Sequence, residues 1–361
     1  MPLVKATCTN CNANLQVDSA KDAAICPYCG TAYIVEKAIN HHSVVNHIQA
    51  DVVNVQGCVN SGFDIRAGVL IKYTGSDIDV TIPNGVIEIG SQAFRDQQYI
   101  VNVNIPEGVK IIRSCAFWGC SELRSIHLPS TLATIESSAF SYSGLVSVTI
   151  PKGITVLNGF EACSELNEIV IPPTVTEIRG LGRNRFKNFE IPNTVKIIGQ
   201  AAFSGCKELE QITIPSSVVE ISTQAFEECT SLSNILIPTS VTSIGSSAFR
   251  ACKSLEEVYI PNSVTTIGGG AFAECTSLKK VILPDNLSII ESYLFGGCSQ
   301  LSDIHFPTCH YSAQSNSFAY TRWENDRRNA WRYKRVCDRC GGSFKGVFEK
   351  HCTRCGQKKQ Y

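Results

Sequence analysis

The sequence has no run approaching the roughly 18 consecutive apolar residues that a membrane-spanning helix requires. Its first fifteen residues contain one Lys, no apolar core and an early Cys8, a pattern unlike a secretory signal. Charged residues are also sparse, at 18% against 43% hydrophobic residues, which argues against a disordered chain. We therefore expect a folded cytoplasmic protein with no membrane partner.

The balance of charge differs between the C-terminal end and the rest of the chain. Residues 321–361 contain 12 Lys and Arg against 4 Asp and Glu, a net charge of +8. Because the totals are 32 and 32, the first 320 residues contain 20 basic and 28 acidic residues, a net charge of −8. Basic charge with aromatics such as Trp331 and Phe344 is typical of single-stranded nucleic-acid binding. The acidic remainder should repel phosphate, so we expect nucleic acid to bind weakly at most, through residues 321–361.

A repeat of about 23 residues organises the middle of the chain. Proline after a large apolar residue recurs every 20 to 23 residues, at Pro83, Pro106, Pro129, Pro151, Pro172, Pro192, Pro215, Pro238, Pro261, Pro284 and Pro307. A second register keeps step with it, at Phe94, Phe117, Phe140, Phe160, Leu181, Phe203, Phe226, Phe249, Phe272, Phe295 and Phe318. The two registers together indicate one structural unit repeated along the chain.

Residues 237–260 show the pattern inside one repeat. The segment Leu255-Glu-Glu-Val-Tyr-Ile260 alternates like a short strand, and the proline that follows cannot donate to a sheet ladder. The segment Val241-Thr-Ser-Ile-Gly245 then turns the chain back. One such coil has too little apolar surface to offset its ordering entropy, so neighbouring coils must stack. The sequence therefore predicts a mainly β solenoid.

These units, of the form Ile-Pro-x-x-Val-x-x-Ile-Gly-x-x-Ala-Phe-x-x-Cys-x-x-Leu, resemble the BspA-like leucine-rich repeats of bacteria. The resemblance covers about residues 63–307, and the segment Gly68–Gly75 is similar to the N-terminal capping coil of that family. It implies a leucine-rich repeat array of about 23-residue coils. Many relatives are surface or adhesion proteins, a role that the resemblance would imply here only with an export signal.

Two sets of four cysteines lie at the two ends of the chain. Each set consists of two Cys-x-x-Cys pairs, with 14 intervening residues in the first set and 11 in the second. A Cys-x-x-Cys turn presents two sulfurs to one ion, so paired turns complete a tetrahedral zinc site. Both ends resemble zinc ribbons, which implies two zinc ions. The expected ligands are Cys8, Cys11, Cys26 and Cys29, and Cys337, Cys340, Cys352 and Cys355.

The tetrapeptide Cys26-Pro-Tyr-Cys29 is also that of glutaredoxin-like active sites, which raises the alternative of a thiol-disulfide oxidoreductase. Such a site opens a helix in a βαβ domain, and no room for that domain exists before the solenoid. The zinc interpretation is therefore preferred. Seven further cysteines recur once per coil, and we expect them to fill the core as small apolar residues. They are Cys120, Cys163, Cys206, Cys229, Cys252, Cys275 and Cys298.

Motifs of catalysis are missing from the repeat region. His127 and His305 are expected on the outward side of strands, with no nucleophile or carboxylate pattern around them. The run Gly268-Gly-Gly270 lacks the spacing of a phosphate loop and the Lys-Ser/Thr that would follow it. We therefore expect no enzymatic activity.

What remains is recognition by the outward side of the strands. The residue two before each proline should point away from the core. Three adjacent coils place Leu236, Tyr259 and Ile282 at this position, and stacked apolar residues on a surface favour a protein interface. The alternative is ordinary β-propensity on an open sheet face.

The resulting prediction is a protein-binding scaffold in five parts. They are an N-terminal zinc ribbon (1–40), a linker (41–62), a leucine-rich repeat solenoid with caps (63–320), a capping helix or linker (321–336) and a C-terminal zinc ribbon (337–361). The alternative from another class is a nucleic-acid-associated adaptor that acts through the basic C-terminal ribbon. The identity of a protein partner cannot be read from these residues.

Overall fold

The computed structural model describes residues 62–309 and 311–326, together with the backbone of five short strands before them. The chain divides into two compact units, Met1–Val175 and Thr176–Tyr361, called unit 1 and unit 2 below. The strands before residue 62 form two antiparallel pairs and one parallel pair. They are β1 (Leu3–Thr7) with β2 (Asn14–Asp18), β3 (Ala23–Ile25) with β4 (Ala32–Ile34), and β5 (Val53–Asn54) with β1.

Unit 1 begins its repeats with an antiparallel hairpin, β6 (Phe63–Arg66) and β7 (Val69–Tyr73). Strand β7 then pairs in parallel with β9 (Glu88–Ile89) on its other side. The Tyr73 side chain is fully buried, and its ring lies 4.9 Å from that of Phe63 and 5.1 Å from that of Phe94. The hairpin thus covers the open end of the first coil, at the position expected for a capping coil.

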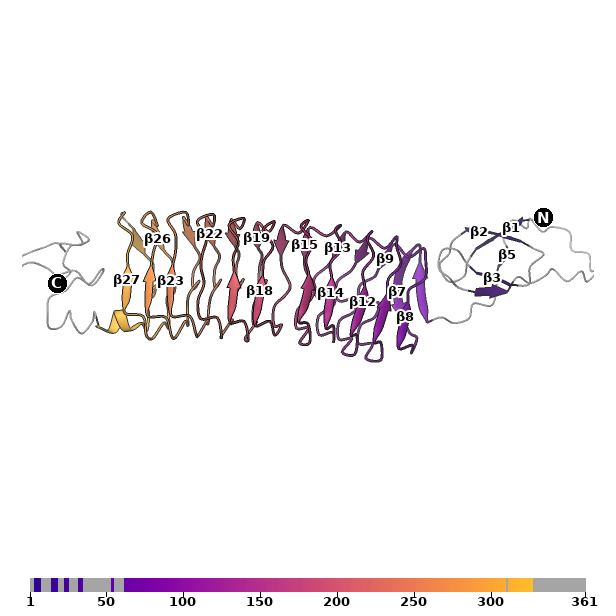
Figure 1. Ribbon diagram of the computed structural model, residues 1–361, viewed down its shortest axis with the longest axis horizontal. Coiled ribbons are helices and arrows are strands. Elements are labelled where there is room, and N and C mark those ends of the chain that lie inside the picture. Colours follow the sequence, from indigo (N-terminus) through magenta and orange to yellow (C-terminus); the bar gives the residue numbers. More distant parts are fainter. Residues whose placement is uncertain are drawn as a thin grey trace, which may run out of the picture. The chain divides into compact units, whose positions relative to one another are not determined.

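Each regular coil contains a three-residue strand that ends two residues before the proline. These strands run parallel, and their surface is called face A (Figure 1). In unit 1 they are β8 (Asp79–Thr81), β10 (Asn102–Asn104), β12 (Ser125–His127), β14 (Ser147–Thr149) and β16 (Glu168–Val170). In unit 2 they are β18 (Asn188–Glu190), β20 (Gln211–Thr213), β23 (Glu257–Tyr259), β25 (Lys280–Ile282) and β27 (Asp303–His305). The predicted strand alternation is confirmed, because the middle residue of most of these strands is buried between two exposed ones.

A second, two-residue strand follows each proline turn, and the surface of these strands is called face B. In unit 1 they are β9 (Glu88–Ile89), β11 (Ile111–Ile112), β13 (Thr134–Ile135) and β15 (Val156–Leu157). In unit 2 they are β17 (Glu177–Ile178), β19 (Ile197–Ile198), β21 (Glu220–Ile221), β22 (Ser243–Ile244), β24 (Thr266–Ile267), β26 (Ile289–Ile290) and β28 (Ser312–Ala313). Sequence analysis gave this segment as a turn, because two residues are too few to show alternation. Each unit is therefore a β solenoid of stacked coils, which confirms the predicted fold class for the repeats.

The predicted phenylalanine register forms the centre of the core. In unit 2 the rings of Phe203, Phe226, Phe249 and Phe272 are fully buried and stack with planes within 9° of each other. Neighbouring centroids in this column are 5.2 to 5.4 Å apart, the range of favourable offset stacking. Coil-to-coil hydrogen bonds fix this spacing, since the Phe226 amide donates to the Ala248 carbonyl oxygen at 2.7 Å.

Each regular coil also has two residues with left-handed backbone on either side of the buried Ala-Phe step. In the coil of Phe249 they are Ser247, with φ of 55°, and Ala251, with φ of 57°. Glycine takes the same positions in other coils, as at Gly270 and Gly297. A left-handed non-glycine residue costs about 1 to 2 kcal/mol, so the turn is held by the stacking of neighbouring coils rather than by local preference.

Residues 322–326 are helical and follow the last coil of unit 2. Thr321 is fully buried and caps this helix, because its hydroxyl accepts from the Glu324 amide at 3.0 Å while the Glu324 carboxylate accepts from the Tyr320 amide. The Trp323 ring lies 4.9 Å from the Phe318 ring and 5.3 Å from Phe306. The helix therefore covers apolar rings at this end of the described coils.

Candidate protein-binding face

The predicted binding residues lie on face A of unit 2. The side chain of Leu236 is 73% exposed and that of Tyr259 is 53% exposed. Ile282 is paired in register with Tyr259, and the next strand places His305 on its other side. These two neighbours leave Ile282 only partly exposed, so the patch is centred on Leu236 and Tyr259.

The three residues do not share one continuous sheet. Residues 233–237 form no strand, so the sheet of face A in unit 2 is divided into β18–β20 and β23–β25–β27. Asn234 occupies the strand position that Glu257 and Lys280 fill in the next two coils. The expectation of three equivalent stacked strands is therefore wrong at Leu236. The interruption leaves that side chain more exposed than its neighbours in the row.

Charged pairs border the apolar patch. Lys279 Nζ lies 2.9 Å from a carboxylate oxygen of Glu256, and Lys280 Nζ lies 4.0 Å from Asp303. All four side chains are about half exposed, so water screens these pairs and they add little stability. An apolar centre with a charged, hydrated margin is the usual arrangement of a protein-binding surface.

The corresponding row of unit 1 is polar. Its outward residues are Thr81, Asn104, His127 and Thr149, with one exposed apolar residue, Val170, at 49% exposure. Both histidines of the two rows, His127 and His305, are exposed at strand ends as expected. Among the described residues, the run of apolar outward side chains therefore belongs to unit 2.

A second aromatic surface was missed by sequence analysis. In unit 1 the Arg95 guanidinium lies 4.6 Å from the centroid of the Trp118 ring, and the Tyr142 ring meets Trp118 edge-on at 5.4 Å. Tyr142 is 47% exposed. Trp, Tyr and Arg are the residue types most enriched at binding hot spots. The available signal was that all three come one or two residues after the inward Phe of successive coils.

The cysteines of the repeats are buried and free, as expected for core residues. Each thiol donates to a backbone carbonyl of the preceding coil, as Cys252 does to Phe226 at 3.2 Å and Cys298 to Phe272 at 3.0 Å. Burial raises the pKa of Cys252 to about 12, because the thiolate would lose its hydration. A thiol with such a pKa is a poor nucleophile, so these residues serve the fold rather than redox chemistry.

The eight expected zinc ligands, Cys8, Cys11, Cys26, Cys29, Cys337, Cys340, Cys352 and Cys355, lie outside the described residues. Among the residues that the structure describes, no group of His, Cys, Asp and Glu is placed to hold a metal ion. Within that same part of the chain, no helix is both long and apolar enough to cross a membrane.

The fold and the outward strand faces define a leucine-rich repeat solenoid. The chain belongs to the family described as BspA type leucine-rich repeat region, whose model matches residues 72–181, 181–295 and 220–326. This match confirms the predicted BspA-like family and indicates no catalytic family. Solenoids of this family are typically non-enzymatic binding scaffolds.

Solved structures of bacterial leucine-rich repeat proteins are similar to this chain. One from Bacteroides ovatus is 26% identical with a TM-score of 0.49, over 72% of this chain and 84% of that chain. A leucine-rich cell surface protein from Faecalibacterium prausnitzii is 26% identical with a TM-score of 0.45, over 70% and 81% of the two chains. No curated protein matches the sequence.

Proposed function

We propose that the protein is a non-enzymatic scaffold that binds a protein partner through face A of unit 2. The observation that carries this proposal is the exposed pair Leu236 and Tyr259 on neighbouring coils, at 73% and 53% exposure. Exposed apolar area of this kind is stabilised when a partner removes it from water. A tyrosine contributes a large contact area at low entropic cost, which suits the centre of an interface.

The test is affinity capture with matched variants. Tyr259→Ala should lower partner affinity by about 2 kcal/mol, or about 30-fold, if Tyr259 is a hot spot. Thr213→Ala is the control, because Thr213 is an exposed residue at the same position of face A on β20. Both variants should keep the stability of the wild type within about 0.5 kcal/mol, since both side chains are on the surface.

The capture is carried out with and without nuclease treatment of the lysate. A protein that is retained by the wild type and by Thr213→Ala, survives nuclease and is lost with Tyr259→Ala supports the proposal. Equal retention by Tyr259→Ala would place the interface on another surface. Capture that disappears after nuclease treatment would favour the nucleic-acid adaptor through residues 321–361.

We also propose that each four-cysteine set binds one structural zinc ion. Cys8 and Cys11 lie in the chain between β1 and β2, and Cys26 and Cys29 lie between β3 and β4. Each pair therefore falls at the connection of an antiparallel hairpin, which is where a zinc ribbon carries its ligands. Four thiolates complete a tetrahedral shell and leave no open position for water, so such zinc would be structural.

A further inference from the structure

Face B of unit 2 carries a groove with a volume of about 840 Å³ that the proposed function does not use. It extends over the coils from β17 to β24 and ends at Glu291, which directly follows β26. Its floor is formed by the residues that directly follow the face B strands. In three successive coils these residues are small, namely Ser222, Gly245 and Gly268, whereas Arg179 follows β17 at one end of the groove and pairs with Glu177.

Coil stacking keeps this floor open. A Cβ atom on Gly245 would lie 2.3 Å from the Thr223 backbone nitrogen, and one on Gly268 would lie 2.4 Å from that of Ser246. Side chains at these two positions would therefore force neighbouring coils apart. At these two coils the groove is therefore a consequence of close backbone approach.

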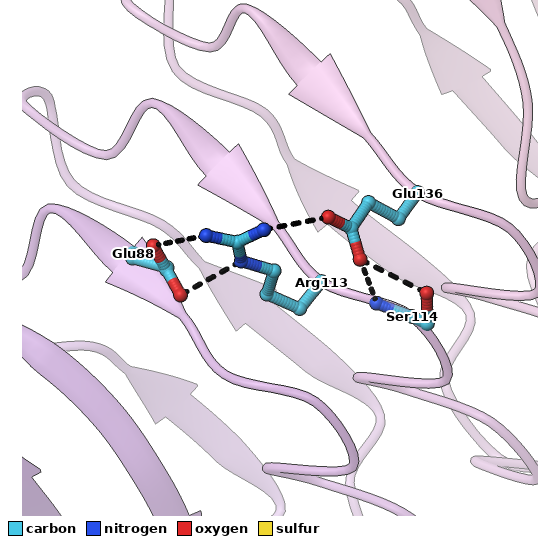
Figure 2. Close-up of polar contacts among 4 residues, drawn as sticks. All are labelled: Glu88, Arg113, Ser114 and Glu136. Atoms are coloured by element: carbon cyan, nitrogen blue, oxygen red, sulfur yellow. Dashed lines mark hydrogen bonds and ion pairs between the residues drawn. The ribbon is translucent and has the colours of Figure 1, made fainter.

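In one coil of unit 1 the same position carries a base. Arg113 follows strand β11 and donates to Glu88 at 2.8 and 3.0 Å and to Glu136 at 2.8 Å, and Glu136 also accepts from the amide and hydroxyl of Ser114 (Figure 2). These contacts raise the pKa of Arg113. At this coil a basic side chain between two carboxylates thus pairs with the acidic residues of face B.

Two carboxylates of the unit 2 groove have no such partner. Glu220 and Glu291 are half-buried and form no ion pair with any described residue, although Glu220 accepts from the Ser222 hydroxyl at 2.6 Å. From Thr176 to Cys309, every other acidic side chain is either paired with a base or exposed. Partial burial weakens screening by water and salt. These two carboxylates should therefore attract a cation more strongly than the exposed acidic residues of unit 2.

The two ends of the chain outside the repeats differ in charge. Residues 1–61 contain 3 basic and 4 acidic residues, a net charge of −1. Residues 327–361 contain 11 basic and 2 acidic residues, a net charge of +9. This C-terminal segment begins directly after Asp326, the last described residue of unit 2, and the ten residues that precede Cys337 could span on the order of 30 Å when extended. It complements the groove in charge and can reach it.

The spacing of the basic residues also matches the groove. Glu220 and Glu291 are three coils apart, which at about 4.8 Å per coil is about 14 Å along the groove. An extended chain covers that distance in about four residues, and residues i and i+4 then point to the same side. In the part of the C-terminal segment that precedes Cys337, basic residues stand at this interval at Arg328 and Arg332.

We propose that residues 327–361 bind in the face B groove of unit 2 of the same chain, with basic side chains paired to Glu220 and Glu291. The segment then supplies the cations that Arg113 supplies in unit 1. Binding depends on charge, so salt releases the segment and exposes the groove. The proposal does not depend on the partner of face A.

Carbodiimide cross-linking of the full-length protein tests the contact directly, because it joins a carboxylate to a lysine amine without a spacer. At low salt, Glu220 and Glu291 should link to lysines beyond residue 326 within monomers, at a yield independent of protein concentration. At about 1 M salt, where the Debye length is about 3 Å, these links should be lost. Links found only in dimers would assign the groove to a second copy of the chain and overturn the proposal.

Limited trypsin digestion of matched variants gives an independent readout. Cleavage at residues 327–335, which precede the cysteines, should be at least tenfold faster in the Glu220→Gln/Glu291→Gln double variant than in the wild type. The control is Glu210→Gln/Glu257→Gln, which neutralises two exposed carboxylates that form no ion pair and lie near face A.

A second variant keeps both carboxylates and adds a positive charge instead. Ser222→Arg places a base next to Glu220, as Arg179 stands next to Glu177 in the coil of β17. It should also accelerate cleavage, because the new arginine competes with the segment. Unchanged cleavage in both groove variants, with the thermal unfolding of the wild type retained, would contradict the proposal.

Discussion

Truncation of Phe226 should be among the most destabilising single changes in unit 2. Its ring is fully buried and stacks at 5.4 Å on Phe203 and at 5.2 Å on Phe249. Phe226→Ala therefore abolishes the stacking of this ring on both neighbours and leaves a cavity shared by adjacent coils. Such a change costs about 3 to 5 kcal/mol of unfolding free energy in a packed core.

The upper part of that range is expected because this site cannot collapse. The Phe226 amide donates to the Ala248 carbonyl at 2.7 Å, and its own carbonyl accepts from the Cys252 thiol at 3.2 Å. These bonds hold the two neighbouring coils at their spacing after the ring is removed. A cavity that the surrounding residues cannot fill carries the largest penalty.

Denaturant unfolding followed by circular dichroism measures this cost. Two matched variants provide the reference values for this cost. Thr239→Ala changes an exposed residue after Pro238 and should stay within about 0.5 kcal/mol of the wild type. Phe226→Leu keeps much of the side-chain volume and should cost markedly less than alanine. If Phe226→Ala lost no more stability than Thr239→Ala, the inward phenylalanine column would be refuted.

The thiols, the left-handed turns and the terminal cysteine sets provide further tests. Burial raises the pKa of Cys252 from 9.0 to about 12, so its stabilising effect is complete below about pH 9 and is lost as pH rises through about 12. The urea midpoint should therefore fall in alkali, and less steeply in Cys252→Ser; a midpoint that rises with pH would contradict this. Ser247 has φ of 55°, so Ser247→Gly should be neutral or stabilising by up to about 1 kcal/mol, and Ser247→Val destabilising; the reverse order would refute the conformational argument. Elemental analysis should find two zinc ions per chain in reductively purified protein and one in Cys29→Ser, with the solenoid still folded, whereas one zinc or fewer in the wild type would exclude two sites.

The core could be predicted from the sequence because each coil repeats the same inward residues. The position of Phe226 is fixed by an interval that ten other coils share, and burial of that column follows from stacking alone. The three-residue strands of face A were predictable for the same reason, since alternation is visible within one coil. Both features recur in nearly every coil, so the repeated sequence pattern predicts them.

Departures from the average repeat were harder to predict. The break at residues 233–237 could not be predicted from Asn234, because asparagine at the same position begins a strand at Asn102 in β10 and at Asn188 in β18. The Arg95, Trp118 and Tyr142 surface requires knowledge of which residues of the turn face solvent. Face B itself rests on strands of two residues, which are defined by hydrogen bonds between coils and by nothing within one coil.

The residue that follows the face B strand decides what this surface can do. At Gly245 the backbone of the neighbouring coil lies too close for a side chain, whereas the equivalent position in another coil holds Arg113. Arg113 pairs with Glu88 and Glu136 of the two neighbouring coils. A small residue leaves a half-buried carboxylate such as Glu220 without a cation, and the partner must then come from outside the coils. The residue at this single position therefore decides which charge face B presents at a given coil. The core that stabilises the coils stays the same.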